Sequence, residues 1–484
     1  MFIIDTVLGI DLGTSACRSA VFDNQLNILG ASYREYPLIY ISSTHIEQDP
    51  EDWWSIVKLT LCEAIRNSGI SSHSIRSIAL SSQGISVVPV DKVGHALSNA
   101  ISWLDTRASS EVEQLKSRYG SKMIYELSGK RLTETYSLPK LMWIKDNQPD
   151  IYERTYKFLL PLDYIELRLC GEYVTDHTMA AGTMYYDIKQ QNWATDILAE
   201  CDIDKQKLPN ICWSGTPIGR ILPTVAKELG LDSNTLIVQG AQDQKCAAYA
   251  AGVSSTVVTV SLGTASSITQ ICNQPVFDPK IRIPCFSFVS PFLWDIESII
   301  GTAGAAYNWF RNTCGSGMGF DQLSNIEKNL TDEQCVFFYP YLTGMLTPFW
   351  KDGSGAFIGI TLATTTGHLV RSIFEGIACN IRTNLEIMSQ IYKPSQEMRL
   401  FGGGVKSDSW CQYIANITNI PIKTLSTPET ALAGAAMLAA QGSIIEIPKS
   451  LPISKEYLPN IDMVSKYDDY YKRYEETRCK LFNV

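Results

Sequence analysis

Three short turns that follow apolar, strand-like segments carry the residue types that phosphate chemistry needs. Gly13, Thr14 and Ser15 form the first turn, and Gly263 and Thr264 form the second. Turns of this kind expose backbone N–H groups and hydroxyls that can bind phosphate oxygens. Two such turns facing each other would clamp a triphosphate between them.

The third turn lies in residues 401–408 and includes Gly402, Gly403 and Gly404. Glycine has no Cβ, so the backbone there can approach a flat ligand such as adenine or ribose closely. The residues alone leave two alternatives open. The first turn could be an ordinary hairpin turn, and the third could be a loop that only lets two elements pack together.

Two aspartates near the ends of predicted strands could act on a phosphate group. Asp11 precedes the first turn by two residues, where its carboxylate could hold Mg²⁺ directly or through water. Asp243 follows the strand predicted at residues 236–240 and could accept a hydroxyl proton while that oxygen attacks phosphorus. A helix is predicted at residues 245–251, so Asp243 could instead cap its N-terminus, and position alone does not separate the two roles.

Other catalytic and binding classes lack their characteristic patterns. The sequence has neither a Gly-x-x-x-x-Gly-Lys-Ser/Thr loop nor a Gly-x-Ser-x-Gly motif, and its 5 histidines show no metal-ligand spacing. The 13 cysteines include no Cys-x-x-Cys pair, which argues against a disulfide framework or a zinc ribbon. The formal net charge is -9 with no basic run, so nucleic acid is not an expected partner.

The composition and the N-terminus favour a soluble, cytoplasmic protein. Hydrophobic residues make up 45% of the chain, which is enough for buried cores. Asp5 and Asp11 interrupt the N-terminal apolar stretch, which also lacks a positively charged start and is therefore a poor signal peptide. No uncharged apolar run approaches the roughly 18 residues that a membrane helix needs, so no membrane association is expected.

The elements that must position these groups alternate between strand and helix, which is typical of an α/β fold. An apolar strand that ends in Gly-Thr occurs at residues 7–14 and again at residues 257–264, and this weak repeat predicts two similar lobes that face each other. Strands at 7–13, 19–23 and 28–31 should form an antiparallel meander, followed by a helix at 50–67 and a strand at 77–82. Further predicted elements are helices at 138–147, 163–169 and 409–418 and strands at 267–269 and 398–404.

Five motifs, in order, resemble the FGGY family of carbohydrate kinases over almost the whole chain. Residues 10–15 and 261–264 are similar to the two phosphate motifs of the family, and residues 401–408 to its C-terminal signature. Residues 374–378 and 429–436 resemble two helical segments. The resemblance implies an α/β fold of two actin-like (ribonuclease H-like) lobes with a cleft between them. The lobes would be residues 1–244 and 245–484.

The resemblance also implies roles for individual positions. Asp243 would be the catalytic base, and Asp11 would help to place Mg²⁺. Phosphate or ATP contacts are implied for Gly13, Thr14, Ser15, Gly263, Thr264, Trp309, Gly403, Gly404 and Asp408. Sugar contacts are implied for Gln83, Gly84, Trp103, Asp105, Asp243 and Gln244.

Within the family, the xylulokinases are the most similar group, through residues 47–54, 103–107 and 159–164. Where xylulokinases usually have Gln-Met-His-Gly, this chain has Gln83, Gly84, Ile85 and Ser86. Residues 344–348 also depart from the xylulokinase pattern, and Gln244 is more like glycerol kinases. Loss of hydroxyl-binding groups changes specificity, so we expect weak activity on D-xylulose and a different preferred sugar.

These observations lead to one main hypothesis, an ATP- and Mg²⁺-dependent kinase for a ketopentose or a related polyol. Gluconate, a glycerol-like polyol or another ketose are alternative substrates. An actin-like or chaperone-like ATPase would have no use for the segments around Gln83, Trp103 and Asp105. A sugar-binding pseudokinase is disfavoured because Asp11 and Asp243 are retained. The expected partner is a small sugar, and a homodimer is one possible assembly.

Overall fold

The first sheet is built on an antiparallel meander, as the sequence predicts. The computed structural model describes residues 5–315, 317–330 and 335–484. In it β1 (Thr6–Leu12) pairs with β2 (Ala16–Phe22), which pairs with β3 (Ile28–Glu35). β6 (Ile75–Ser82) and β15 (Leu236–Gln242) extend the sheet in parallel beyond β1, and β14 (Pro217–Arg220) forms the edge.

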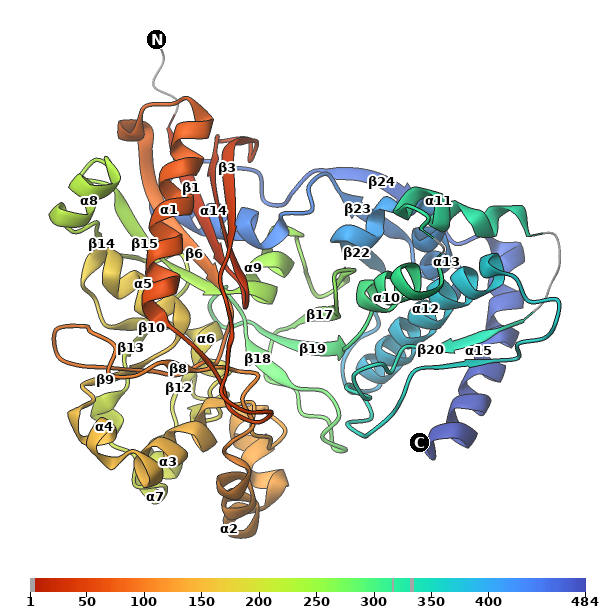
Figure 1. The fold of residues 1–484 in the computed structure, drawn as a ribbon, viewed down its shortest axis with the longest axis horizontal. Coiled ribbons are helices and arrows are strands. Elements are labelled where there is room, and N and C mark those ends of the chain that lie inside the picture. Colours follow the sequence, from red (N-terminus) through yellow and green to blue (C-terminus); the bar gives the residue numbers. More distant parts are fainter. Residues whose placement is uncertain (1–4, 316, 331–334) are drawn as a thin grey trace.

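The second sheet repeats this topology, which confirms the predicted internal repeat and the two actin-like lobes. Its meander consists of β16 (Val257–Ser261), β17 (Ser266–Cys272) and β19 (Trp294–Ile300). β22 (Glu397–Phe401) and β23 (Ile422–Leu425) follow in parallel, and β18 (Cys285–Ser287) and β24 (Ile453–Tyr457) flank the sheet. Figure 1 shows the two lobes side by side.

Local sequence signals explain where the main helices begin and end. In α1 (Pro50–Ser68), the Asp49 side chain accepts a hydrogen bond from the Glu51 amide, and Gly69 ends the helix in the left-handed conformation. The helices that flank the two sheets are α1, α9 (Asp243–Ala250), α12 (Thr366–Ile391), α13 (Asp408–Thr418) and α14 (Thr430–Gly442). The predicted helices at 50–67, 245–251 and 409–418 are therefore confirmed to within two residues at each end.

Shorter elements surround the two sheets. The remaining helices are α2 (Ser109–Ser128), α3 (Ser137–Asn147), α4 (Pro149–Arg154), α5 (Pro161–Cys170), α6 (His177–Ala181), α7 (Thr195–Glu200), α8 (Pro223–Leu229), α10 (Gly304–Cys314), α11 (Phe320–Asn325) and α15 (Ile461–Phe482). The remaining strands are β4 (Ile39–Tyr40), β5 (Ile46–Gln48), β7 (Val88–Val90), β8 (Ala100–Ile101), β9 (Lys157–Leu159), β10 (Val174–Asp176), β11 (Tyr186–Asp187), β12 (Asn192–Trp193), β13 (Asn210–Cys212), β20 (Phe337–Tyr339) and β21 (Ala356–Ile358). Within the described residues, no helix combines the length and apolar character needed to cross a membrane.

Helix α14 comes late in the chain but packs on the first sheet, against β1, β6 and β15 and beside α9 (Figure 1). The contact is close because small residues line it. A Cβ added to Gly434 would lie 2.1 Å from the Cys246 carbonyl oxygen, and one added to Gly9 would lie 2.5 Å from that of Leu432. The division of the chain at residues 244 and 245 stays a prediction.

We predict that Gly434→Ala destabilises the protein by about 1–3 kcal/mol, because the added methyl group forces α14 away from α9. Gly319→Ala is the matched control, since its Cβ would point into open space and its φ of -68° suits alanine. Urea unfolding of both variants measures the difference. Equal midpoints would contradict the close packing of α14.

Candidate active site

A cavity of about 690 Å³ lies between the lobes, at the carboxyl ends of strands from both sheets. Parallel strands point their carboxyl ends in one direction, so the residues that follow β1, β6, β15, β16 and β22 meet at one edge. The predicted site residues in its wall are Asp11, Thr14, Gln83, Gly84, Trp103, Asp243, Gln244, Gly263 and Thr264. The cavity therefore joins groups that lie more than 250 residues apart in sequence.

Hydrogen bonds from neighbouring side chains and backbone amides hold the two Gly-Thr turns in place. In the first, Gln48 Nε2 donates to the Thr14 carbonyl oxygen at 2.8 Å, and Trp103 Nε1 donates to Thr14 Oγ1 at 3.0 Å. In the second, the Thr264 carbonyl accepts from the amides of Ala303 and Ala305, both at 3.0 Å. Within the described chain, the backbone amides of Thr14 and Thr264 donate no backbone hydrogen bond, so both are suited to donate to phosphate oxygens.

Asp243 does not cap the helix that follows it. The cap is Gln242, whose Oε1 accepts from the amides of Gln244 and Lys245 at 3.1 and 3.2 Å. Asp243 is the first helical residue; its Oδ1 accepts from the Gln244 amide at 2.7 Å, and its side chain lines the cavity. The capping alternative for Asp243 is therefore ruled out by the structure.

Asp11 and Asp243 both line the cavity, and both have a raised pKa. Burial, together with the negative charge of Asp11, raises the pKa of Asp243 to about 7. Burial also raises the pKa of Asp11, although the Ser81 hydroxyl, which donates to Asp11 Oδ1 at 2.8 Å, opposes the shift. A carboxylate that exchanges a proton near neutral pH suits general base catalysis.

Several polar side-chain groups in the cavity wall have no hydrogen-bond partner among the described residues. Gln83 is only 2% exposed, yet neither its side-chain Oε1 nor its side-chain Nε2 makes a hydrogen bond within the described chain. The hydroxyls of Ser266 and Ser267 are also buried and unpartnered. Buried polar groups are normally hydrogen-bonded, so these atoms are suited to binding the hydroxyls of a polyol.

Seven predicted residues lie outside the cavity wall. Asp105 is fully buried and ion-paired with Arg107 at 2.8 Å, and its Oδ2 accepts a hydrogen bond from the Ile46 amide. Asp408 is exposed and accepts from Lys455 and Tyr457 at 2.8 and 2.6 Å. The other five are Gly13, Ser15, Trp309, Gly403 and Gly404.

These five residues are either close in sequence to residues that line the cavity or exposed on the surface. The Gly13 amide closes its turn onto the Ala16 carbonyl oxygen at 2.9 Å, Ser15 is exposed, and Trp309 on α10 is 42% exposed. Gly403 and Gly404 directly follow Gly402, which does line the cavity. The Gly404 amide donates to the Leu262 carbonyl oxygen at 2.9 Å, which joins the third turn to the second.

The cavity also contains residues that sequence reasoning missed. They include Arg18, Tyr136, Lys245, Phe286, Glu297, Ile299 and Glu429. Lys245 in α9 and Glu297 in β19 could have been suspected from the sequence, because each is a charged residue beside apolar residues of its element.

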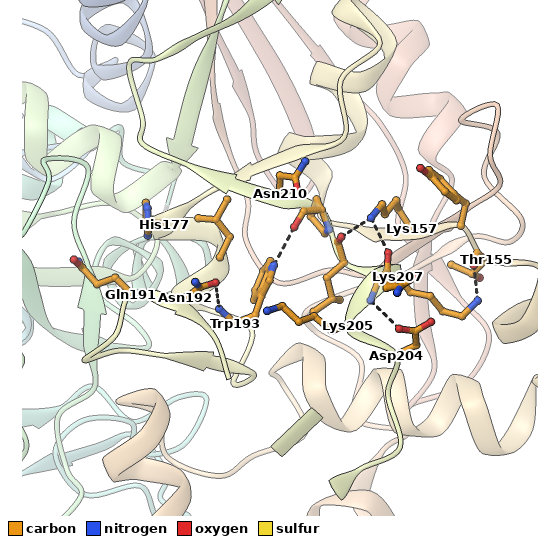
Figure 2. Close-up of a pocket in the computed structure, with 15 residues that line it drawn as sticks. Thr155, Lys157, His177, Gln191, Asn192, Trp193, Asp204, Lys205, Lys207 and Asn210 are labelled. Carbon is orange, nitrogen blue, oxygen red and sulfur yellow. Dashed lines mark hydrogen bonds between the residues drawn. The ribbon is translucent and has the colours of Figure 1, made fainter. Parts of the chain in front are cut away.

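A second cavity, of about 1000 Å³, lies within the N-terminal lobe and contains neither turn (Figure 2). Two of the lysines that line it, Lys157 and Lys207, donate hydrogen bonds to backbone carbonyl groups of the protein. Lys157 Nζ donates to the carbonyl oxygens of Gln206 and Leu208 at 2.7 and 2.8 Å, and Lys207 Nζ donates to that of Thr155 at 2.6 Å. These contacts connect residues 155–157 to residues 206–208. The cavity between the lobes is therefore the better candidate for catalysis.

Two Gly-Thr turns from different lobes line one cavity together with two carboxylates in an actin-like fold, an arrangement typical of phosphotransferases. The chain matches the family model "FGGY family of carbohydrate kinases", with its N-terminal domain at residues 6–250 and its C-terminal domain at residues 258–443. The chain belongs to this family and is an ATP-dependent sugar kinase.

Similar proteins include xylulose kinase from Bacillus subtilis, 31% identical over 441 residues that cover 90% of this chain and 88% of the relative. A ligand-bound xylulose kinase structure from Lactobacillus acidophilus has a TM-score of 0.91 and 27% identity, with 98% of each chain covered. A gluconate kinase structure from the same organism has a TM-score of 0.90 and 27% identity, covering 99% of this chain and 98% of that one.

Ile85 in the cavity wall is a strained position that offers a test. Its φ is 59°, which is unfavourable for a β-branched residue and easier for histidine. We predict that Ile85→His raises kcat/KM for D-xylulose and does not lower the melting temperature, because imidazole adds a hydroxyl-binding group. Ile85→Leu is the control that adds no polar atom, and equal D-xylulose activity in both variants would contradict the prediction.

Proposed function

We propose that this sugar kinase transfers the γ-phosphoryl group of ATP to a hydroxyl of a ketopentose or a related polyol, with Asp243 as the general base. The observation that carries the proposal is the single cavity that holds Asp243 between two Gly-Thr turns from different lobes. The xylulose kinase relatives support a ketopentose, whereas the gluconate kinase structure names an acid. Likeness alone therefore leaves the charge of the substrate open.

The proposed step is an in-line displacement. The sugar oxygen forms a bond to the γ-phosphorus while the bond from that phosphorus to the β,γ-bridging oxygen breaks, and ADP leaves with the electron pair. The hydroxyl proton passes to Asp243. Backbone amides at Thr14 and Thr264 would bind the phosphate oxygens, and the Gln83 amide would orient the sugar.

Mg²⁺ belongs to the proposal together with ATP. Among the described residues no group of three or more His, Cys, Asp or Glu could hold a metal. Mg²⁺ is usually bound by one or two carboxylates plus phosphates and waters, so Asp11, whose carboxylate lines the cavity beside the first turn, fits this ion. Bound there, it would neutralise charge on the phosphate oxygens.

The proposed function predicts that one neutral sugar stimulates ADP release by this protein in the presence of ATP and Mg²⁺. A coupled assay over ketopentoses, other ketoses, polyols, glycerol and gluconate measures it. ADP release that no sugar stimulates would contradict the proposed substrate class.

The second prediction concerns the base. Asp243→Asn should lower kcat by roughly 10²–10⁴-fold while the calorimetric affinity for ATP stays unchanged, because the amide cannot accept the proton. Asp150→Asn, on an exposed residue of α4, is the control. Loss of ATP affinity in Asp243→Asn would contradict a role limited to proton transfer.

The same residue sets the expected pH dependence. A base with a raised pKa of about 7 is protonated and inactive at lower pH, so kcat/KM for the sugar should rise with pH through about 7. Steady-state rates between about pH 5.5 and about pH 9 measure this profile. A profile that is flat through neutral pH would contradict Asp243 as the titrating base.

A further inference from the structure

The charged groups in the cavity wall are predominantly acidic. The described lining residues with a formal charge are Asp11, Asp243, Glu297, Glu429, Arg18 and Lys245. Both cations are already paired: Arg18 Nε lies 3.4 Å from a carboxylate oxygen of Glu429, and Lys245 is paired with two carboxylates. A substrate carboxylate would therefore enter a cavity whose positive charges are neutralised.

Lys245 joins the helix that carries the base to the second sheet. Its Nζ donates to Asp295 Oδ2 and to Glu297 Oε2, both at 2.6 Å, and its side chain is 1% exposed. Burial alone lowers the pKa of a lysine, but the two carboxylates outweigh it and raise the pKa of Lys245. The lysine therefore stays charged, and its charge is committed to Asp295 and Glu297.

The two carboxylates differ in their access to the cavity. Glu297 lines it, whereas Asp295 is fully buried and does not. On the paired strands, Ser267 lies opposite Ile299 and Thr269 lies opposite Glu297. Glu297 therefore lies at the level of Thr269, which is two residues further along β17 from the second turn than Ser267. This spacing places Glu297 about 7 Å further from the turn than Ser267, away from the proposed phosphate-binding end of the cavity.

No spare cation was found beside Glu297 in the described part of the chain. Lys130 is near, with its Nζ 3.2 Å from the centroid of the Phe286 ring, but it is fully buried and does not line the cavity. Its ammonium group donates to the Cys285 carbonyl oxygen, and burial lowers its pKa to about 7. Lys130 is therefore not available to bind a substrate anion.

We propose that Glu297, held in place by Lys245, is a specificity-determining residue that accepts hydrogen bonds from sugar hydroxyls remote from the transferred phosphoryl group and excludes sugar acids. The proposal rests on the proposed function and names its substrate class as neutral. A sugar acid would place its carboxylate near Glu297 without a compensating cation, which is unfavourable in a partly buried site. A neutral polyol would instead donate to Glu297, and the unpartnered Ser267 hydroxyl would bind a neighbouring hydroxyl.

The test compares Glu297→Gln with Asp295→Asn. Each variant removes one negative charge from Lys245, but only Glu297→Gln changes the cavity wall. We expect the wild-type protein to prefer a neutral ketose over D-gluconate by at least about tenfold in kcat/KM. Glu297→Gln should lower kcat/KM for the ketose by roughly 10- to 100-fold, mainly through KM for the sugar, and raise the gluconate-to-ketose ratio at least about tenfold.

The control and the remaining outcomes separate the alternatives. Asp295→Asn should leave the gluconate-to-ketose ratio within about threefold of wild type, because its charge does not face the sugar. An equal shift in both variants, or an unchanged ratio in Glu297→Gln, overturns the proposal. A rise in KM for ATP as large as that for the sugar would indicate a structural role only and also overturns it.

Two measurements keep the test decisive. If Glu297→Gln does not fold, the triple variant Lys245→Met/Asp295→Asn/Glu297→Gln removes all three charges of the buried cluster and is measured instead, with melting temperatures recorded for all variants. The wild-type protein tests the charge argument by itself. Phosphorylation of gluconate as efficiently as of any ketose would overturn this inference and leave the kinase activity intact, whereas stimulation by no sugar would instead overturn the proposed function.

Discussion

The direction of the parallel strands is the constraint on which the site depends. In both sheets the central strands run in parallel, so the turns that follow them must lie at one edge. The two lobes bring these edges together, and neither has a complete site on its own. The first supplies Asp11, Gln83 and Asp243, and the second supplies the turn at Gly263 and the strand that carries Glu297.

Electrostatics then divides the cavity into two ends. Near the glycine turns, exposed amides suit an anionic nucleotide. Beyond them, Glu297 and the paired Lys245 make the proposed sugar end suitable for neutral hydroxyls. Asp243 lies between the two ends, with a pKa near neutrality because its environment is buried and negatively charged. In the proposed reaction this carboxylate would accept the sugar proton near neutral pH.

Much of this arrangement could be predicted from local sequence. The meander, the internal repeat and helix α1 follow from apolar periodicity, glycine turns and a capping aspartate, all of which act over a few residues. Of the nine predicted residues that line the cavity, Asp11 is the penultimate residue of β1 and the others follow strand ends. The local pattern indicated Asp11, Asp243 and the two turns, whereas Gln83, Gly84, Trp103 and Gln244 came from the resemblance to the family. Asp105 lies outside the cavity wall, where Arg107, two residues away, binds its carboxylate, and the role implied for it stays a prediction.

The pairing of Lys245 with Glu297 spans 52 residues, so no local pattern could reveal it. The same is true of the position of α14, which depends on tertiary packing. This position has a consequence for how the protein is made. Because α14 covers β1, β6 and β15, the first lobe lacks one of its covering layers until residue 442 has been synthesised. The N-terminal lobe therefore cannot complete its core until most of the C-terminal half has been synthesised, and the folding of the two halves is coupled.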